Sequence, residues 1–168
     1  MTERDIATEN RELAYRLSNN LGRLLREFGK DYENRVHALL NTRGHPDIRP
    51  SHSTVFANLG TGAVRVTELA RRAQVTQQAM GKMLKELERL GYVARDVDST
   101  DKRAREIRLT RKGVQLAADC LEVVDEVRQY YDGKVGATEL AELEDVLRAT
   151  VRTLQLDYLP ESWVDAQP

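Results

Sequence analysis

The sequence predicts a mainly α-helical chain that carries one small β-hairpin. Over most of the 168 residues, apolar side chains recur at steps of three and four, which is the spacing of one helical face. Two short segments have strand character instead: residues 92–97, and residues 105–109, where Ile107 and Leu109 alternate with charged residues. The loop between these segments is rich in Asp, Ser and Thr, residue types that favour turns.

The N-terminal third predicts one long helix, a loop and one short helix. Leucine, valine and aromatic residues keep one phase from residue 9 to residue 41, across Gly29, so we expect a single helix with at most a bend at that glycine. A stripe of this length exceeds what a small domain covers alone, which indicates a partner subunit. After a loop with two prolines, Ser51 is expected to cap a short helix that ends near Leu59.

Two short helices joined by a tight turn come next. We expect Thr67 to cap the first and Thr76 to cap the second, which Gly91 ends as a C′ glycine. Apolar residues from Met80 to Leu90 share one face of the second helix. The opposite face is polar or bare, and it comprises Thr76, Gln77, Gln78, Gly81, Lys82 and Lys85. Such a face can meet base edges in a major groove, and the helix N-terminus can hold a phosphate.

A wing and two further helices complete the chain. The hairpin forms the wing, with Arg65 and Val66 as a short third strand. Thr110 is expected to cap a helix over residues 111–132, and Thr138 is expected to cap the last helix. The inner face of the first of these helices is predicted to comprise Val114, Ala117, Leu121, Val124, Val127 or Arg128, and Tyr131.

Charge is distributed unevenly along the chain, although the net formal charge is only −1. Residues 64–113 contain 13 Lys and Arg against 7 Asp and Glu, whereas residues 114–168 contain 4 against 12. The positive field therefore coincides with the helix pair and the wing, where a phosphate backbone is attracted. This coincidence predicts double-stranded DNA as a partner.

Several classes of protein are disfavoured. Cys120 is the only cysteine, so an intramolecular disulfide is impossible. Its position beside the apolar face of its helix and its acidic neighbours are expected to raise the thiol pKa and to disfavour a redox switch. No run approaches the ~20 apolar residues of a membrane span, and the polar N-terminus is unlike a signal peptide, so a cytoplasmic protein without membrane contact is expected.

No enzyme signature is found either. The chain lacks a phosphate-binding glycine loop, a G-x-S-x-G motif and a Cys/His pair at a recognisable spacing, so we expect no enzyme and no cofactor. The histidines at 37, 45 and 52 match no strong zinc pattern, so we expect no metal.

The segment from Val66 to Gly113 resembles the winged helix-turn-helix of the multiple-antibiotic-resistance regulator (MarR) family. The most specific part is D-x-R followed by L-T-x-x-G, at Asp101, Arg103, Leu109, Thr110 and Gly113. The G-Y-V-x-R segment after the second helix matches as well. Because helix pair, wing motif and strand-to-helix junction occur in the right order, the resemblance is specific, and it covers about a third of the chain.

The resemblance implies a winged helix-turn-helix flanked by long N- and C-terminal dimerisation helices. We expect a single domain, 1–168, with dimerisation helices at 9–45 and 111–157, a DNA-binding region at 51–110 and a tail at 158–168. At the wing, Arg103 is expected to enter the minor groove, held in place by Asp101, while Lys102 and Arg105 contact phosphates. Thr110 and Gly113 are expected to act structurally, as a cap and as a close approach of the wing to the next helix.

These features predict a homodimeric DNA-binding transcriptional regulator, more readily a repressor, that binds a pseudopalindromic operator. The resemblance also implies that a small aromatic effector releases it, with Tyr32, His37 and His52 as candidates for the effector site. The alternative is a winged-helix dimer that acts as a protein-interaction module through its acidic C-terminal third, without specific DNA binding.

Overall fold

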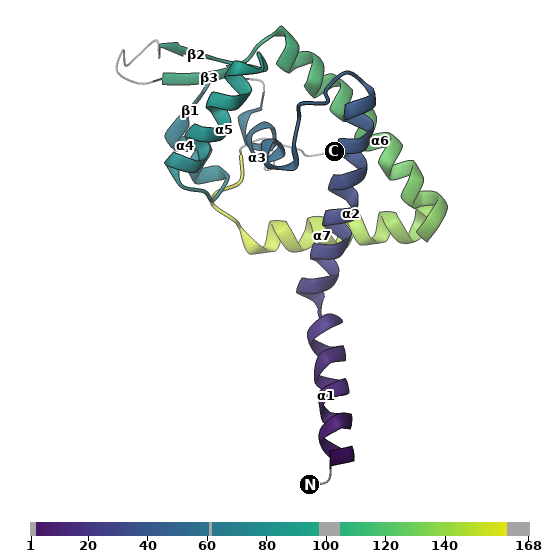
Figure 1. Ribbon diagram of the computed structural model, residues 1–168. Coiled ribbons are helices and arrows are strands. Elements are labelled where there is room, and N and C mark those ends of the chain that lie inside the picture. The colour runs from purple at the N-terminus through teal and green to yellow at the C-terminus, as the bar shows by residue number, and fades with distance from the viewer. Residues whose placement is uncertain (1–2, 61, 98–104, 161–168) are drawn as a thin grey trace. The chain divides into compact units, whose positions relative to one another are not determined.

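The computed structural model describes residues 3–60, 62–97 and 105–160 of the protein (Figure 1). The chain divides into two compact units, Met1–Arg35 and Val36–Pro168. Helices make up most of the described residues, and one small antiparallel sheet supplies the rest of the regular structure. The predicted mainly α-helical fold with a β-hairpin is confirmed.

The first unit contains helix α1 (Glu3–Ser18) and most of α2 (Leu21–Thr42). The expectation of one unbroken helix over residues 9–41 is therefore wrong, although α2 does run through Gly29 without interruption. The break lies at two consecutive asparagines, Asn19 and Asn20, instead of at the glycine.

The two asparagine side chains explain where the break falls. The Nδ2 group of Asn19 donates to the carbonyl of Tyr15 (2.9 Å), and that of Asn20 donates to the carbonyl of Leu17 (2.8 Å). On its other side, Oδ1 of Asn20 accepts a hydrogen bond from the backbone N–H of Arg23 at 3.0 Å. The pair thus satisfies backbone groups at the end of α1 and at the start of α2, in competition with a continuous helix.

The second unit contains the remaining elements. In chain order they are the end of α2, α3 (Pro50–Leu59), β1 (Val64–Arg65), α4 (Val66–Arg72), α5 (Gln77–Arg89), β2 (Val93–Val97), β3 (Arg105–Leu109), α6 (Arg111–Val135) and α7 (Ala137–Leu154). Helices α3, α4 and α5 pack together beside the sheet, and α6 packs against α7 (Figure 1). The core of the helix group and the sheet consists of Val55, Leu59, Leu69, Met80, Leu84, Leu87, Tyr92 and Ile107.

The sheet has the strand order β1-β3-β2, with both pairs antiparallel. In the hairpin, Val93 is opposite Leu109, and on the other side of β3 Val64 is opposite Ile107. The predicted third strand therefore exists, one residue earlier than expected. No helix in the described ranges is long and apolar enough to cross a membrane.

Helix ends agree with the sequence at three positions and differ at others. Gly91 follows α5 at a φ of 79°, as expected of a C′ glycine. Thr76 and Thr110 cap α5 and α6 as predicted. Ser51, Thr67 and Thr138 do not cap α3, α4 and α7, whose N-cap residues are Arg49, Arg65 and Gly136.

Helices α3 and α4 begin at other residues than expected, and α6 ends later than expected. Helix α3 starts with Pro50, whose missing N–H costs nothing in a first turn. Helix α4 starts with Val66. Helix α6 continues through Gly133, so that only Gly136, at φ 114°, separates it from α7.

Candidate nucleic-acid interface

Helices α4 and α5 form the predicted helix-turn-helix. The turn between them contains Gln74 in a left-handed conformation, at φ 55°, which is uncommon for a residue other than glycine. The backbone N–H of Val75 donates to the carbonyl of Ala70 at 3.1 Å and closes the turn onto the end of α4. This tight connection lets α5 start with its N-terminal residues in solvent.

The two faces of α5 separate as the sequence predicts. Met80, Leu84 and Leu87 are completely buried on the inner face. On the outer face, five of the six predicted contact residues are exposed, and Gly81 is half-exposed; the five are Thr76, Gln77, Gln78, Lys82 and Lys85. The hydroxyl of Thr76 accepts the N–H of Ala79 at 3.1 Å, so this side chain serves as the cap of the first turn.

A polar contact between α5 and the start of α3 fixes the position of the exposed face. Glu86 of α5 forms an ion pair with Arg49 and also accepts a hydrogen bond from Nε2 of His52 at 3.3 Å. The other nitrogen of His52, Nδ1, accepts the backbone N–H of Arg49, also at 3.3 Å. His52 is fully buried, and both of its nitrogens are engaged. These residues position α5, and the sequence analysis missed Arg49 and Glu86 because they are far apart in the chain.

The base of the wing is joined to α6 through Thr110 and Gly113. The hydroxyl of Thr110 donates to the carbonyl of Gly91 at 2.6 Å and accepts the N–H of Gly113 at 3.2 Å. A Cβ at Gly113 would lie 2.1 Å from the carbonyl oxygen of Tyr92, so only glycine fits there. The predicted cap and close approach are confirmed.

A buried hydrogen-bond chain continues from the wing base into the following helix. Nδ1 of His45 lies 3.0 Å from the hydroxyl of Tyr92, and Nε2 lies 2.7 Å from Oδ2 of Asp119 on α6. Gln115 donates to the other carboxylate oxygen of Asp119 at 2.9 Å. The hydrogen bonds from His45 and Gln115 hold the pKa of the Asp119 carboxyl below its ordinary value, and burial raises the pKa of Tyr92.

Cationic side chains reinforce the same region. Nζ of Lys112 lies 4.2 Å from the centre of the Tyr92 ring and donates to the carbonyl of Leu90. Arg43, at the end of α2, forms ion pairs with Glu122 and Glu126 of α6 at 3.1 and 2.8 Å. Because these contacts join the wing base, α6 and the end of α2, the wing strands have a fixed attachment to α6.

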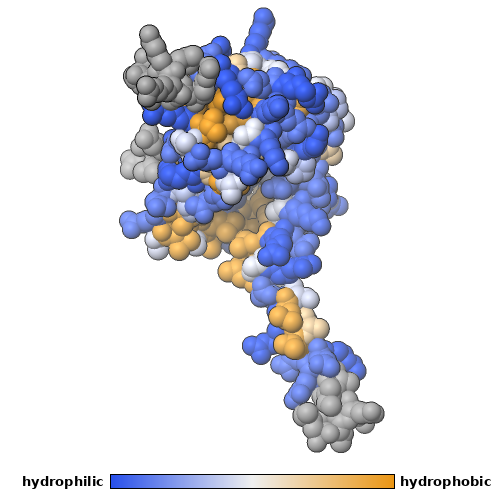
Figure 2. All heavy atoms as spheres, turned by 60° about the vertical axis from the view of Figure 1, so that its left-hand side comes forward, coloured by the Kyte–Doolittle hydropathy of each residue, from blue (hydrophilic) through white to orange (hydrophobic). Residues whose placement is uncertain are grey.

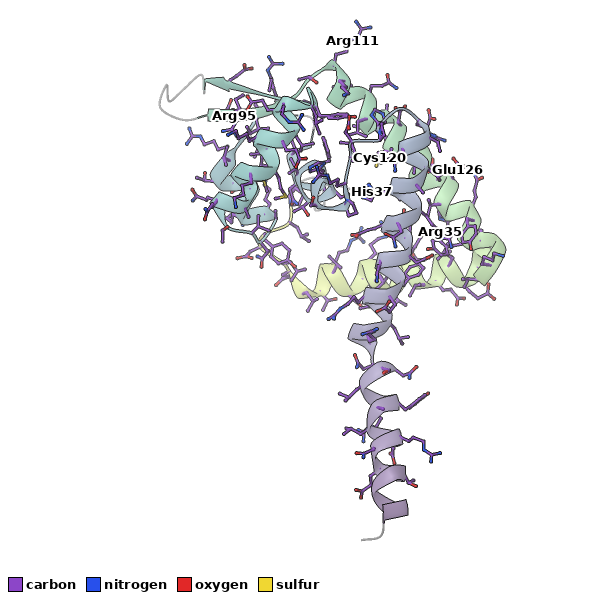
Figure 3. All side chains as sticks on the ribbon, viewed as in Figure 1. Arg35, His37, Arg95, Arg111, Cys120 and Glu126 are labelled. Atoms are coloured by element: carbon purple, nitrogen blue, oxygen red, sulfur yellow. The ribbon has the colours of Figure 1, made fainter. Side chains whose placement is uncertain are left out.

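The strands of the wing carry further charge. Arg108 pairs with Asp96 on the neighbouring strand, and Arg95 lies 3.1 Å from Glu88 at the end of α5. The exposed side chain of Arg111, labelled in Figure 3, points away from the start of α6. Of the predicted wing contacts, Asp101, Lys102 and Arg103 lie outside the described residues, and Arg105 is placed only by its backbone in β3.

Arginines of α4 are engaged within the protein. Glu68 binds Arg71 and Arg72 at 2.9 and 2.7 Å, and these hydrogen bonds lower the pKa of its carboxyl to about 2. Arg71 also donates to the carbonyl of Asp157, in the segment after α7, and Arg72 donates to that of Asn58.

The predicted effector residues fall into different surroundings. Tyr32 belongs to the first unit, whereas His37 and His52 belong to the second. His37 is buried, and its Nε2 lies 3.1 Å from the hydroxyl of Ser53 on α3 (Figure 3 labels His37). His37 and His52 are therefore both buried against or within α3.

Two other sequence expectations concern metals and Cys120. Within the described ranges, no group of three or more His, Cys, Asp and Glu side chains is arranged to hold a metal ion. Cys120 is half-buried on α6, and burial raises the pKa of its thiol. The direction of this shift is the expected one, and of the two expected causes the structure bears out the position of Cys120 on its helix and not the acidic neighbours.

Known proteins share this architecture. Residues 47–104 match the model of the MarR family. The transcriptional regulator HosA from Escherichia coli O157:H7 is 27% identical over 109 residues, which cover 64% of this chain and 81% of HosA.

Solved structures agree with these sequence matches. A MarR-family transcriptional regulator from Rhodococcus sp. RHA1 is 26% identical, with a TM-score of 0.61 over 80% of this chain and 95% of that one. A mutant of MarR from E. coli, solved in complex with operator DNA, is 23% identical, with a TM-score of 0.65 over 81% and 96% of the two chains.

Proposed function

The chain belongs to the MarR family of winged helix-turn-helix transcriptional regulators, and from this premise we propose that it acts as a homodimer on a pseudopalindromic operator. In this proposal residues 51–110 bind DNA, and the helices within 9–45 and 111–157 pair with a second copy. Residues 158–168 form a tail without an assigned role. We propose a cytoplasmic location, because a regulator has to reach its operator.

One observation carries the DNA-binding part of the proposal. The outer face of α5 presents amide, hydroxyl and ammonium groups, while its inner face is locked into the core by completely buried residues. Gln77 and Gln78 match the hydrogen-bonding edge of adenine, and Lys82 suits guanine or a phosphate. The operator complex of the E. coli relative supports the same use of this fold.

The homodimer is supported by apolar side chains that the chain leaves uncovered. On α6, Val114 and Leu121 are exposed by 57% and 71%, and on α7 Val146 and Leu154 are exposed by 63% and 60%. Figure 2 shows apolar side chains at the surface toward the lower edge of the larger unit. A second copy of the chain would cover such surface. It would also place two copies of α5 on half-sites about 10 base pairs apart.

We further propose that the dimer represses transcription, because a protein that covers two adjacent half-sites excludes polymerase from an overlapping promoter. A small aromatic effector then releases it by changing the spacing of the two α5 helices. Tyr32, His37 and His52 remain the candidate effector residues. The engagement of His52 with Arg49 and Glu86 supports an indirect role for it, since a ligand that disturbs His52 also disturbs α5.

The test is a DNA-binding titration of the purified protein against its own upstream region, at two salt concentrations. We expect nanomolar, sequence-selective binding by a dimer, which weakens steeply as salt rises because phosphate counterions compete. Weak binding that is indifferent to sequence would contradict the proposal.

A second candidate function rests on the charge of the C-terminal third, with 4 Lys and Arg against 12 Asp and Glu in residues 114–168. In this alternative the winged-helix dimer binds another protein through that acidic surface and has no operator. Sequence-indifferent DNA binding, together with an intact dimer, would favour it.

A further inference from the structure

Gly81 lies inside helix α5, where a glycine destabilises the helix. The helix spans Gln77–Arg89, so Gly81 is beyond the first turn and has helical neighbours on both sides. Glycine is the least favourable residue after proline in a helix interior, because it loses the most backbone freedom on folding. An alanine at this position would make the free helix more stable.

The surroundings of Gly81 in the protein also allow a side chain. A Cβ built there finds no heavy atom within 4 Å in the part of the chain that the structure describes. Two other glycines differ in this respect. At Gly113 a Cβ would collide with the carbonyl of Tyr92, and Gly91 has a φ of 79° that favours glycine. Gly81 has neither a close neighbour among the described residues nor a positive φ, so neither packing nor backbone conformation requires a glycine at this position.

The position of Gly81 on α5 indicates an external reason. Residues three and four apart are neighbours on a helix surface, which places Gly81 beside Gln77, Gln78 and Lys85. All three side chains are exposed, as is that of the adjacent Lys82. Gly81 is therefore the bare centre of the polar face, and any partner that engages this face meets the helix backbone there.

We propose that Gly81 sets the depth at which α5 enters the major groove of the operator. This inference rests on the proposed function, because it assigns a role within DNA binding. Without a Cβ the helix backbone lies directly against a base-pair edge, and the side chains of Gln77 and Gln78 reach their acceptors and donors. A methyl group at this point holds the helix away from the base pairs, and hydrogen bonds lengthen beyond their useful range.

The proposal predicts effects of opposite sign on stability and on binding. In Gly81→Ala, Tm should rise by roughly 2–4 °C, because alanine favours the helix. Operator affinity should fall by about tenfold or more, the cost of losing one well-formed base contact. Affinity for non-specific DNA should change by less than about twofold, since phosphate contacts elsewhere on the protein persist. Gly81→Gln, with a longer side chain that still favours a helix, should bind the operator more weakly still.

Gly133→Ala is the matched control. Gly133 is also exposed inside a helix, α6, and a Cβ there likewise meets no heavy atom of the described residues within 4 Å. Its substitution should raise Tm by a similar amount and leave the operator affinity of the dimer unchanged, because Gly133 lies outside the DNA-binding region at 51–110. Sedimentation velocity on this variant checks that it is still a dimer at the concentrations used for binding.

Two results would overturn the role of Gly81. Operator binding by Gly81→Ala at the wild-type affinity would show that a Cβ is accommodated. An equal loss on operator and non-specific DNA would show a clash with phosphates and not with base-pair edges. Failure of the proposed function would look different, because the wild-type protein itself would then show no preference for the operator.

Discussion

Helices α5 and α6 begin alike but present opposite kinds of surface. Each starts at a threonine whose hydroxyl accepts a backbone N–H three residues later. On α5 the apolar residues Met80, Leu84 and Leu87 are completely buried, and the exposed side chains near its N-terminus are polar. On α6 large apolar side chains are exposed, while a polar one, Asp119, is drawn into a hydrogen-bond chain with His45.

This difference supports the partner proposed for each helix. The inner face of α5 is fully covered within its own chain, so its outer face is available to a polar, charged ligand. Helix α6 buries Val123 and Val127, but it leaves Val114 and Leu121 uncovered, and water is a poor partner for these two side chains. The contrast supports the proposal that α5 meets DNA and that α6 meets a second copy of the protein.

The largest expected effect tests this comparison with the same substitution on both helices. Leu84→Ala on α5 should reduce the free energy of unfolding by about 2–5 kcal/mol, because it leaves a cavity in a closed core. Leu121→Ala on α6 should change the stability of an isolated chain by no more than about 0.5 kcal/mol, as exposed positions usually do. Urea unfolding at matched protein concentration measures the first effect.

Sedimentation velocity on a dilution series measures how Leu121→Ala affects the dissociation of the dimer. We expect Leu121→Ala to dissociate into monomers at a higher concentration than the wild type does. A strongly destabilised Leu121→Ala monomer would mean that α6 is covered within its own chain, and the contrast between the helices would fail.

What the sequence predicted well depends on neighbours within a few residues. The caps at Thr76 and Thr110 follow from a side chain that reaches three positions along the chain, and the close approach at Gly113 belongs to the matched L-T-x-x-G motif. The two faces of α5 follow from its periodicity. Local chemistry and a specific motif were sufficient in each case.

What the sequence did not predict depends on long-range packing. Periodicity places Val114 and Leu121 on an apolar stripe of α6, but it does not say whether the same chain covers that stripe, and the predicted inner face was wrong at both positions. His45 meets Tyr92 and Asp119 across separations of 47 and 74 residues, which no local pattern encodes. The break at Asn19–Asn20 was missed because the apolar phase continues across it.

The next effect concerns the polar face of α5. Gln77→Ala should cost ~1–3 kcal/mol of binding free energy on the operator and relax the preference at one base step, because a bidentate contact to adenine is lost. Binding to a panel of operators that differ at single base pairs measures both. Lys85→Ala is the control, and its loss should be similar on every sequence. A uniform loss for Gln77→Ala as well would make Gln77 a phosphate contact.

A smaller effect is expected at the wing. Arg103→Ala should weaken DNA binding on all sequences and lower the slope of log affinity against log salt by about one unit, because one phosphate-neutralising charge is removed. Lys134→Ala, which removes the same charge near the end of α6, should leave the slope unchanged. An unaltered slope in Arg103→Ala would remove this residue from the DNA contact.

The smallest effect concerns Asp119, the carboxylate of α6 that forms a hydrogen bond with His45. Hydrogen bonds from His45 and Gln115 keep the pKa of Asp119 below its ordinary value of 3.8 in the folded protein. A carboxyl group with a lowered folded pKa stabilises the fold fully above its unfolded pKa, and this contribution is lost as the pH falls toward the folded value.

Asp119→Asn keeps the shape of the side chain and removes its titration. At roughly pH 7, where an aspartate is ionised, the Tm of the variant should be slightly lower than that of the wild type. Between roughly pH 5 and pH 3, where an aspartate titrates, the Tm of the variant should decline slightly less than that of the wild type. Glu142→Gln, an exposed change on α7, controls for the loss of one negative charge. Identical pH profiles for Asp119→Asn and the wild type would mean that His45 and Asp119 do not interact in solution. The wing base would then be attached to α6 through Thr110, Gly113 and Lys112, and the hydrogen bond between His45 and Asp119 would contribute nothing to stability.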